Sequence, residues 1–273
     1  MNELRLEATL FRLLRGLVEE RTGIFYAETH RDVFSSRVWE RMVDAGFESP
    51  LDYYYYLRYD AASSADFDAL VDQLVVNESY FFREPEQLAS LRDDVLRPLV
   101  KAGQRPRVWC AAASTGEEPL SVAMLLAEAG LLAQVEIVAT DISQKALARA
   151  KSGAHSPASL RLLPAGAHER WMSTEDGHVT VAAEIREKID WRQVNLLDER
   201  AVAGLGTFDA ILCRNVLIYF RDETVRRVVS TLTGALSAGG RLFVGASESL
   251  IRFGTLLHCD ERSGAFSYFR ADP

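Results

Sequence analysis

The stretch WCAAASTGEEPLS (109–121) joins a loop of small side chains to a pair of acids. From Ala111 to Gly116 the loop carries almost no side-chain bulk, so a ligand can lie directly against the backbone. The N-terminus of the following helix favours anions, but Glu117 and Glu118 stand there and would repel a phosphate. A Lys-Ser/Thr pair after Gly116 and a GxGxxG pattern are both missing. The stretch therefore favours a ligand with a positively charged group, such as a sulfonium, over ATP or NAD.

Asp141 is a candidate for binding ribose hydroxyls. It follows the apolar run VEIVAT (135–140). In dinucleotide-binding folds a ribose-binding acid typically lies about 20 residues after the first loop, and the separation between Gly116 and Asp141 is close to that spacing. Two simpler interpretations stay open: Asp141 caps the helix that begins near Ser143, and the two glutamates only favour a helix dipole. Together, the small loop and the acids favour S-adenosyl-L-methionine, whose demethylated product is S-adenosyl-L-homocysteine.

Two later strand ends carry further candidates. VNLLD (194–198) places Asn195 and Leu196 where an adenine can be sandwiched and hydrogen-bonded. CRNVLIYF (213–220), at the end of another apolar strand, supplies Asn215, Val216 and Tyr219. Its Arg214 is costly at a buried strand end unless it has a partner. The alternative, an ordinary surface arginine, stays open.

These candidates must be positioned by strands and helices that alternate along the chain from residue 105. The alternation predicts a doubly wound α/β domain, a parallel sheet with helices on both faces. The expected strands are 107–112, 135–140, 189–197, 208–213, 240–247 and 266–270. The expected helices are 117–130, 143–153 with Ser143 as its N-cap, and 221–240 with a stop at Gly239 and Gly240.

Residues 154–188 interrupt this alternation. The pair Asp176-Gly177 stands between two short strand-like runs, which predicts a hairpin. We therefore expect a small β-subdomain inserted in the α/β domain.

Residues 1–76 predict a small all-α N-terminal domain. Apolar residues recur at helical spacing in four segments, 10–23, 31–46, 49–60 and 64–76. Ser49 followed by Pro50 is typical of a helix start. Residues 77–104 link the two domains and contain an expected helix over 88–100, and residues 105–273 form the ligand-binding α/β domain.

Composition and charge exclude several classes of protein. The chain has 273 residues, a net charge of −8 and a pI of about 5.3, which does not support nonspecific binding of nucleic acid because that needs a basic footprint. There is no apolar signal-peptide core and no run of about 18 apolar residues, so we expect a cytoplasmic protein without membrane insertion. The three cysteines are far apart, without CxxC or CxxH spacing, and predict neither disulfides nor a metal site.

Six motifs, taken in order, carry a family resemblance: NESYFFRE (77–84), WCAAASTGEEPLS (109–121), ATDIS (139–143), VNLLD (194–198), ILCRNVLIYF (211–220) and GASESL (245–250). Over nearly the whole chain the sequence resembles the chemotaxis receptor methyltransferases, the CheR family. The resemblance implies a class I S-adenosyl-L-methionine-dependent methyltransferase that forms glutamate methyl esters on the cytoplasmic domains of chemoreceptors. It also implies a helical N-terminal domain and a β-subdomain in the α/β domain.

The resemblance implies roles for individual residues. Arg83 serves in the active site, and Tyr219 is the aromatic hydroxyl near the reacting centre. The family more often has Thr at the position of Ser79, and a hydroxyl is kept here. With the small loop included, the expected cofactor contacts are Asn77, Ser79, Arg83, Ala111, Glu117 or Glu118, Asp141, Asn195, Leu196, Asn215 and Val216. The alternative for Arg83 is a surface ion pair with Glu84 or Glu86.

Contact with the receptor is expected at Arg37 and Arg41, which share a helix face at i,i+4 spacing. Because residues 1–76 hold 8 Lys and Arg against 14 Asp and Glu, a solvated helix face is the alternative. In some family members the β-subdomain holds a peptide tether, but residues 154–188 match the family poorly, with His155 where an aromatic is common. Tether binding is therefore not supported here, and we expect a monomer.

Two other functions fit the same cofactor motifs. One is an adaptor that binds S-adenosyl-L-methionine or S-adenosyl-L-homocysteine and signals through partners, against which Arg83 and Tyr219 argue. The other is a methyltransferase for another protein or a small molecule, against which the helical N-terminal domain argues. The [DN]PP[YFW] motif of amino-directed DNA methyltransferases is absent.

Overall fold

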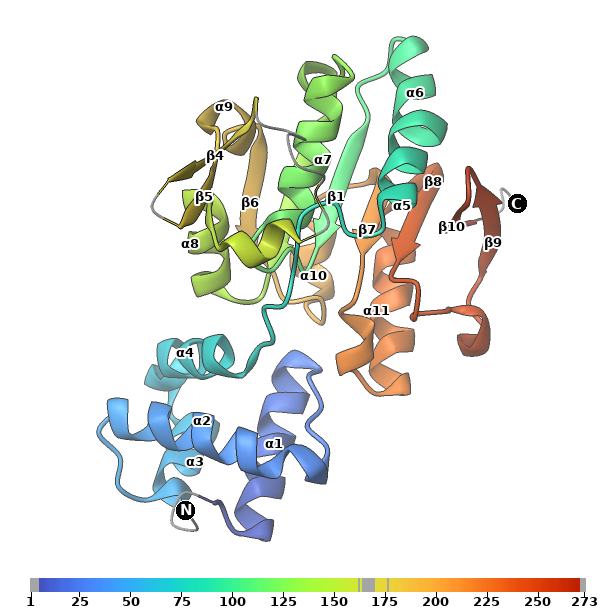
Figure 1. Cartoon of the computed structure of the whole chain (residues 1–273). Coiled ribbons are helices and arrows are strands. Elements are labelled where there is room, and N and C mark those ends of the chain that lie inside the picture. Colours follow the sequence, from blue (N-terminus) through green and yellow to red (C-terminus); the bar gives the residue numbers. More distant parts are fainter. Residues whose placement is uncertain (1–4, 162, 164–169, 176, 271–273) are drawn as a thin grey trace. The chain divides into compact units, whose positions relative to one another are not determined.

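The structure, a computed structural model, describes residues 5–161, 163, 170–175 and 177–270 (Figure 1). The chain divides into two units. The first comprises Met1–Val76 with Tyr219–Thr224, and the second comprises Asn77–Ile218 with Val225–Pro273. Within the described residues no helix has the length and apolar character needed to cross a membrane.

The first unit is helical. Its helices are α1 (Ala8–Thr22), α2 (Arg31–Asp44), α3 (Pro50–Tyr59) and α4 (Ser64–Leu74). All four predicted helices are confirmed. The side chain of Ser49 accepts the N–H of Asp52 at the start of α3, as the Ser-Pro signal predicts. The apolar stripe of α1 is buried at Leu14, Leu17 and Val18.

The second unit is built on a seven-stranded sheet of order β6-β2-β1-β7-β8-β10-β9 (Figure 1). The strands are β1 (Arg107–Ala111), β2 (Glu136–Asp141), β6 (Ile189–Gln193), β7 (Phe208–Cys213), β8 (Leu236–Val244), β9 (Leu257–Arg262) and β10 (Ala265–Arg270). The first five in the spatial order are parallel, and β10 and β9 are antiparallel. The doubly wound fold class is confirmed.

Two details of the sheet differ from the sequence prediction. Strand β9 was not expected, because it is a polar edge strand whose side chains are mostly exposed. The predicted helix stop at Gly239 and Gly240 is wrong, because α11 ends at Gly234 and both glycines lie inside β8. A Cβ on Gly240 would lie 2.8 Å from the carbonyl oxygen of Phe208, so this glycine permits close approach of β7 and β8.

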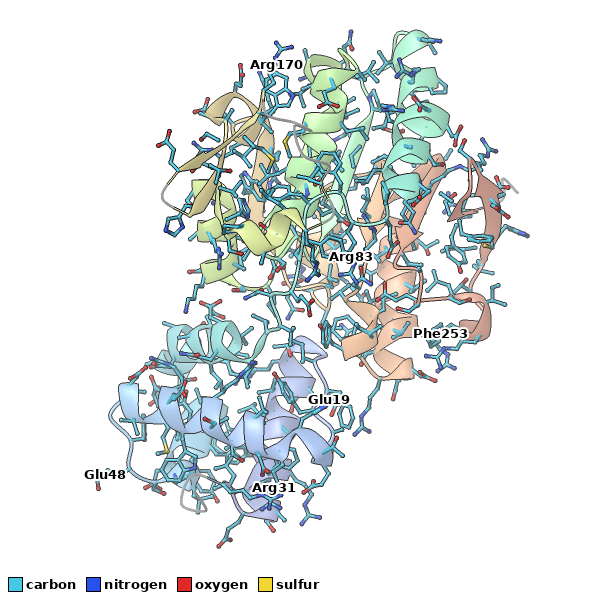
Figure 2. All side chains as sticks on the ribbon, in the orientation of Figure 1. Glu19, Arg31, Glu48, Arg83, Arg170 and Phe253 are labelled. Carbon is cyan, nitrogen blue, oxygen red and sulfur yellow. The ribbon has the colours of Figure 1, made fainter. Side chains whose placement is uncertain are left out.

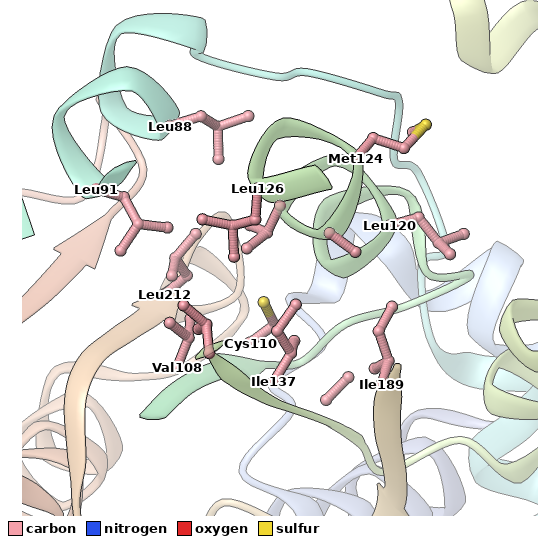
Figure 3. Close-up of a cluster of buried hydrophobic side chains, with 14 of the residues drawn as sticks. Leu88, Leu91, Val108, Cys110, Leu120, Met124, Leu126, Ile137, Ile189 and Leu212 are labelled. Carbon is pink, nitrogen blue, oxygen red and sulfur yellow. The ribbon is translucent and has the colours of Figure 1, made fainter. Parts of the chain in front are cut away.

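Helices pack on the sheet. They are α5 (Pro85–Ser90), the π-helical η3 (Leu91–Leu96), α6 (Arg97–Lys101), α7 (Glu117–Glu128), α8 (Gln144–Ser152), α10 (Glu199–Ala203) and α11 (Asp222–Gly234). Helices α5 to α6 form the predicted connecting helix. The π-helical turn η3 of this connecting helix precedes Pro98, whose nitrogen has no N–H to donate to the helix. Figure 3 shows the core between α5, α7 and the sheet, with Leu88, Leu126, Val108 and Ile137 in one cluster.

A three-stranded sheet of order β3-β5-β4 is inserted between α8 and β6. Its elements are β3 (Ala154–His155), η5 (Pro157–Leu160), β4 (Met172–Glu175), β5 (His178–Val181) and α9 (Ala183–Arg186). The antiparallel pairing of β4 with β5 confirms the predicted hairpin, although Asp176 lies outside the described residues. The remaining short helices are η1 (Glu28–His30), η2 (Ala61–Ser63), η4 (Leu132–Gln134), η6 (Leu217–Tyr219) and η7 (Ile251–Phe253).

Candidate functional site

Strands β2, β1 and β7 are neighbours, and their carboxyl ends lie level. Ala111 at the end of β1 pairs with Thr140 of β2 and with Cys213 of β7. Its side chain is buried in the core, and its backbone leads into the small-residue loop. The loops after these strands, together with residues 77–84 and 245–248 that contact them, are called the strand-end site below.

The strand-end site concentrates left-handed backbone. Among the described non-glycine residues, six have positive φ, and five of these belong to the site: Phe82, Glu84, Ala112, Ser114 and Asn215. Such conformations cost about 1 to 3 kcal/mol each and persist where the surroundings enforce them, typically at functional sites. Small side chains at Ala112 and Ser114 lessen this cost, which explains part of the small-residue composition of the loop.

Asp141 ties this loop to the next strand. Its Oδ2 accepts the N–H of Ser114 at 2.7 Å, and its Oδ1 accepts the N–H of Ser143 at 2.9 Å. Ser143 itself caps α8 by accepting the N–H of Ala146 at 3.0 Å, as predicted. Asp141 therefore shapes the strand-end site, and binding of ribose hydroxyls stays a prediction for it.

Gly116 has a packing reason to lack a side chain. Its φ is 96°, and a Cβ there would lie 2.6 Å from the Cβ of Ala150 and 3.1 Å from the ring of Trp191. The glycine therefore lets the start of α7 approach α8 closely.

The two adjacent glutamates have different surroundings. Glu117 is buried, accepts the hydroxyl of Thr115 at 2.7 Å, and lies 2.9 Å from Nδ1 of His155. Burial acts to raise its pKa, but the hydrogen bond and charge of His155, together with the bond from Thr115, bring the pKa of Glu117 below its ordinary value. Its side chain is only 4% exposed, against 16% for that of Glu118.

Glu118 faces the charged groups of the strand-end site. Its Oε2 accepts Nη1 of Arg214 at 2.9 Å. Burial raises the pKa of Glu118, and the neighbouring charge of Glu84 adds to this, while Arg214 and Arg83 oppose it. Of the two acids, Glu118 is therefore the one placed among the site's other ionic groups.

Arg214 is not the surface arginine that the sequence left as an alternative. Its side chain is 1% exposed and lies between Glu118 and Glu84, whose Oε2 is 3.6 Å from Nη2. It also donates to the carbonyl oxygen of Arg83. Two carboxylates compensate the burial of its charge, and the contact to residue 83 holds the 77–84 segment against β7.

The segment 77–84 carries three predicted site residues. The Oδ1 of Asn77 accepts the hydroxyl of Ser114 at 3.2 Å, which brings the first motif to the small-residue loop. Ser79 is half-buried in the same segment. The guanidinium of Arg83 lies 5.2 Å from the ring centroid of Tyr80.

Arg83 lacks the surface ion pair that was considered as its alternative. Glu84 is instead directed to Arg214, at 3.6 Å, and to the N–H of Ala246, at 3.3 Å. Among the ion pairs of the described residues, none involves Arg83. Its role in the active site stays a prediction.

Asn195 and Leu196 follow β6, next to the end of β2. The N–H of Val194 donates to the carbonyl of Asp141 at 3.0 Å, and Oδ1 of Asn195 accepts the N–H of Leu197 at 3.0 Å. Leu196 is buried. The structure thus brings this stretch beside Asp141, while its contact with an adenine stays a prediction.

Asn215 and Val216 follow β7, and a buried acid holds them. Glu248 accepts the N–H of Asn215 at 2.6 Å, of Gly245 at 2.8 Å and of Ile218 at 3.3 Å. Burial raises the pKa of Glu248, and its backbone hydrogen bonds oppose that shift. Val216 is half-buried beside Asn215. This carboxylate therefore fixes the left-handed turn after β7.

Three predicted residues belong to the helical unit. Tyr219 begins the segment Tyr219–Thr224, and its carbonyl accepts the N–H of Phe25 at 2.9 Å. Arg37 donates to the carbonyl of Leu74 at 2.9 Å, and Arg41 pairs with Asp66. Both arginines thus bind inside the helical unit, and their receptor contact, like the catalytic role of Tyr219, stays a prediction.

Sequence reasoning missed two residues of the site. Glu248 lies in the motif GASESL but received no role, although an acid in the short loop after a buried strand is a detectable signal. His155 was noted only for its departure from the family. Its partner Glu117 is distant in sequence, so no local pattern could have paired them.

A sheet of this order, with five parallel strands, an acid at the end of β2 and small, tightly turned loops at its carboxyl edge, is typical of the class I S-adenosyl-L-methionine-binding methyltransferase fold. Comparison with protein families identifies the family within this class. Residues 77–262 match "CheR methyltransferase, SAM binding domain", and residues 9–75 match "CheR methyltransferase, all-alpha domain". The chain belongs to the CheR methyltransferase family.

Three relatives illustrate the similarity. Chemotaxis protein methyltransferase 2 of Vibrio cholerae is 36% identical over 99% of this chain and 96% of its own length. Chemotaxis protein methyltransferase 1 of Pseudomonas aeruginosa is 35% identical over 88% of this chain and 90% of its own. The chemotaxis protein methyltransferase of Escherichia coli is 34% identical over 88% and 84%.

Proposed function

We propose that this chain transfers a methyl group from S-adenosyl-L-methionine to glutamate side chains on the cytoplasmic domains of chemoreceptors, forming methyl esters. The relatives of this chain are named chemotaxis protein methyltransferases, which supports a chemoreceptor as the acceptor. The observation that carries the choice of a carboxylate acceptor is the Arg83 guanidinium, which has no ion pair among the described residues. We place the reaction in the cytoplasm.

The described residues fit the cofactor. Three buried polar atoms of the strand-end site have no hydrogen-bond partner among them: Oε2 of Glu84, Nε of Arg214 and Oδ1 of Asn215. Two acceptors and one donor suit a ligand that carries both an ammonium and a carboxylate group. Buried polar atoms without partners are rare in folded proteins, so these atoms support a polar ligand at this edge.

We assign the cofactor contacts as follows. Asp141 holds the ribose, and Asn195 with Leu196 holds the adenine. Glu118, rather than Glu117, is the acid of the STGEE motif on the ligand side, since Glu117 is engaged by Thr115 and His155. The remaining contacts are Asn77, Ser79, Arg83, the backbone at Ala111, Asn215 and Val216.

Methyl transfer to a glutamate requires little proton transfer by the protein. The bound cofactor supplies a methyl group on a sulfonium sulfur, which leaves as a neutral thioether. A glutamate is ionised at neutral pH, so its oxygen needs no general base. Arg83 can fork onto one side of that carboxylate and leave one oxygen free. Catalysis then rests on alignment and on excluding water.

Residues of the helical unit complete the proposal. Tyr219 is proposed to hydrogen-bond the acceptor or line the path of the methyl group. Arg37 and Arg41 are proposed to meet the acidic receptor helices, at the cost of their present bonds to Leu74 and Asp66. No observation favours a cofactor-sensing adaptor or a different acceptor.

The test is a methylation assay with methyl-labelled S-adenosyl-L-methionine and a purified chemoreceptor cytoplasmic fragment. The expected result is label on the fragment that is released as methanol by mild base, the signature of a carboxyl ester. Label that resists base, or a fragment that stays unlabelled while the protein binds S-adenosyl-L-homocysteine, would reject glutamate esterification. A fragment with its glutamates changed to alanine serves as the control.

A further inference from the structure

The ring of Tyr80 is flanked by two arginines. The guanidinium carbon of Arg83 lies 5.2 Å from its centroid, and that of Arg161 lies 4.1 Å from it. Cations at these distances are attracted to the ring face. Arg161 is outside every sequence motif described above, yet it contacts the same aromatic ring as Arg83, the proposed active-site arginine.

Backbone contacts fix how Arg161 reaches this position. It follows η5 of the inserted β-subdomain, where the carbonyl of Ser159 accepts the N–H of Phe81 at 2.9 Å. The ring of Phe81 also packs edge-on against His155 at 4.9 Å. The subdomain therefore contacts the 77–84 segment at several points. These contacts position Arg161 beside Tyr80.

The charges around Tyr80 do not cancel. Arg161 pairs with Glu78 at 3.2 Å, but the side chains are 47% and 71% exposed, so the pair is weak. Arg83 has no ion pair among the described residues. Glu84 and Glu118, the other acids near Arg83, pair with Arg214. Among the ion pairs of the described residues, the two guanidinium groups beside Tyr80 therefore have one acidic partner, the solvated Glu78.

We propose that Arg161 binds a second carboxylate of the acceptor, one helical turn away from the glutamate that Arg83 holds. On a helix, side chains three or four residues apart have Cβ atoms about 5 to 6 Å apart. The guanidinium carbons of Arg83 and Arg161 both lie within 5.2 Å of one ring centroid, and we infer that two long acidic side chains one turn apart can reach both. The preferred acceptor is therefore an acidic helical segment. This inference rests on the proposed function and adds a specificity-determining residue to it.

The first test compares Arg161→Ala with the unchanged chain, using a chemoreceptor cytoplasmic fragment as the varied acceptor. The expected result is a KM for the fragment about fivefold higher, the scale of a partly exposed ion pair, with kcat and the affinity for S-adenosyl-L-homocysteine unchanged. The difference shrinks as salt rises, because exposed charges are screened. Arg161→Lys keeps the charge and is expected to recover part of the loss.

Arg170→Ala is the matched control. Arg170 is an exposed arginine of the same insert that stacks on Trp171 at 4.5 Å, and Figure 2 shows it far from Arg83. The Arg170→Ala substitution removes the same charge and a similar stacking contact as Arg161→Ala. Because Arg170 lies away from the Tyr80 cluster, its removal is expected to leave the KM for the fragment unchanged. An equal rise in both variants would mean that overall charge, and not the Tyr80 cluster, attracts the acceptor.

A change on the acceptor side separates binding from positioning. In a fragment whose acids one turn from the methylated glutamate are changed to glutamine, the unchanged chain and Arg161→Ala are expected to have the same KM. A fall in kcat at constant KM would show that Arg161 acts by orienting Arg83, which overturns the inference. If esters form and Arg161→Ala has normal KM at low salt, this inference alone fails. If the unchanged chain forms no ester, the proposed function fails first.

Discussion

Replacing Glu248 by alanine is expected to weaken folding and cofactor binding together. The carboxylate of Glu248 accepts the backbone N–H groups of Asn215, Gly245 and Ile218 at 2.6, 2.8 and 3.3 Å. Alanine removes the acceptor and leaves the N–H groups of the buried Gly245 and the half-buried Asn215 without a partner, while Ile218 is exposed to solvent. Asn215, a proposed cofactor contact, then loses the bond that holds its left-handed conformation.

The expected size of the effect follows from the two short bonds. A buried donor left without a partner costs about 1 to 3 kcal/mol, so the N–H groups of Asn215 and Gly245 together predict a loss of about 3 kcal/mol in unfolding free energy. For a domain of this size that lowers the thermal midpoint by roughly 6 to 12 °C. Because left-handed backbone costs about 1 kcal/mol or more, the released turn relaxes, and the Kd for S-adenosyl-L-homocysteine is expected to rise about tenfold.

Urea unfolding and calorimetric titration with S-adenosyl-L-homocysteine measure the two effects separately. Glu248→Gln keeps one acceptor oxygen and is expected to lie between the unchanged chain and Glu248→Ala. Glu261→Ala removes an exposed carboxylate of β9 and is the control. If Glu248→Ala unfolds within about 0.5 kcal/mol of the unchanged chain and binds the product with the same Kd, the claim that Glu248 organises the site is refuted.

Three further predictions concern the site and its support. Arg83→Ala is expected to lower kcat about 10²-fold, because the acceptor loses its positioning cation, while the Kd for S-adenosyl-L-homocysteine rises less than about tenfold, because Arg83 is one of several proposed contacts; single-turnover kinetics and calorimetry measure these quantities. The Arg92 guanidinium lowers the pKa of Asp93 from 3.8 to about 2. The lowered pKa means that Asp93 contributes stability above pH 3.8 that is lost as the pH falls toward 2; acid unfolding of Asp93→Asn is expected to be less steep in that window. Gly116→Ala is expected to cost about 2 kcal/mol more than Gly130→Ala, because both have positive φ but only the first meets a neighbouring Cβ, at 2.6 Å; urea unfolding compares them.

Each of these predictions has a contradictory outcome. Near-normal turnover of Arg83→Ala would remove the guanidinium from the mechanism. An acid unfolding curve of Asp93→Asn that superimposes on that of the unchanged chain would show that the carboxylate gains nothing from its arginines. Equal destabilisation by the two glycine substitutions would mean that α7 and α8 can move apart without cost.

The sequence predicts the fold where patterns are local and strong. The four N-terminal helices carry apolar stripes and caps, and Ser49 and Ser143 both cap as expected. Strand β9 was missed because an edge strand exposed on both faces has no apolar alternation to detect. The prediction from Gly239 and Gly240 is wrong because glycine pairs usually end helices, whereas here both lie inside β8 and Gly240 allows β7 and β8 to approach.

The site was harder to predict than the fold. Asp141 and Asn215 are predicted to lie at one edge because parallel strands place their carboxyl ends together, whereas Asn77 reaches that edge from the segment 77–84 through its contact with Ser114. Which acid faces the site could not be read from two adjacent glutamates, since the answer depends on His155, which is distant in sequence. The role of Glu248 likewise appears only when three backbone donors converge on it.

The reactivity proposed for Arg83 depends on how the neighbouring charges are divided. Two acids, Glu84 and Glu118, lie in the same site, and an ion pair with either of them would neutralise the charge of Arg83. Arg214 engages both, at 3.6 and 2.9 Å, from a position that is 1% exposed. A buried cation keeps its acids close, because separating them would leave each charge desolvated and unpaired. Arg83 is the more exposed of the two arginines. Its charge acts on Glu118 from a distance, but the printed ion pairs of both acids are with Arg214, so we expect the acceptor carboxylate to meet a guanidinium without a direct acidic partner.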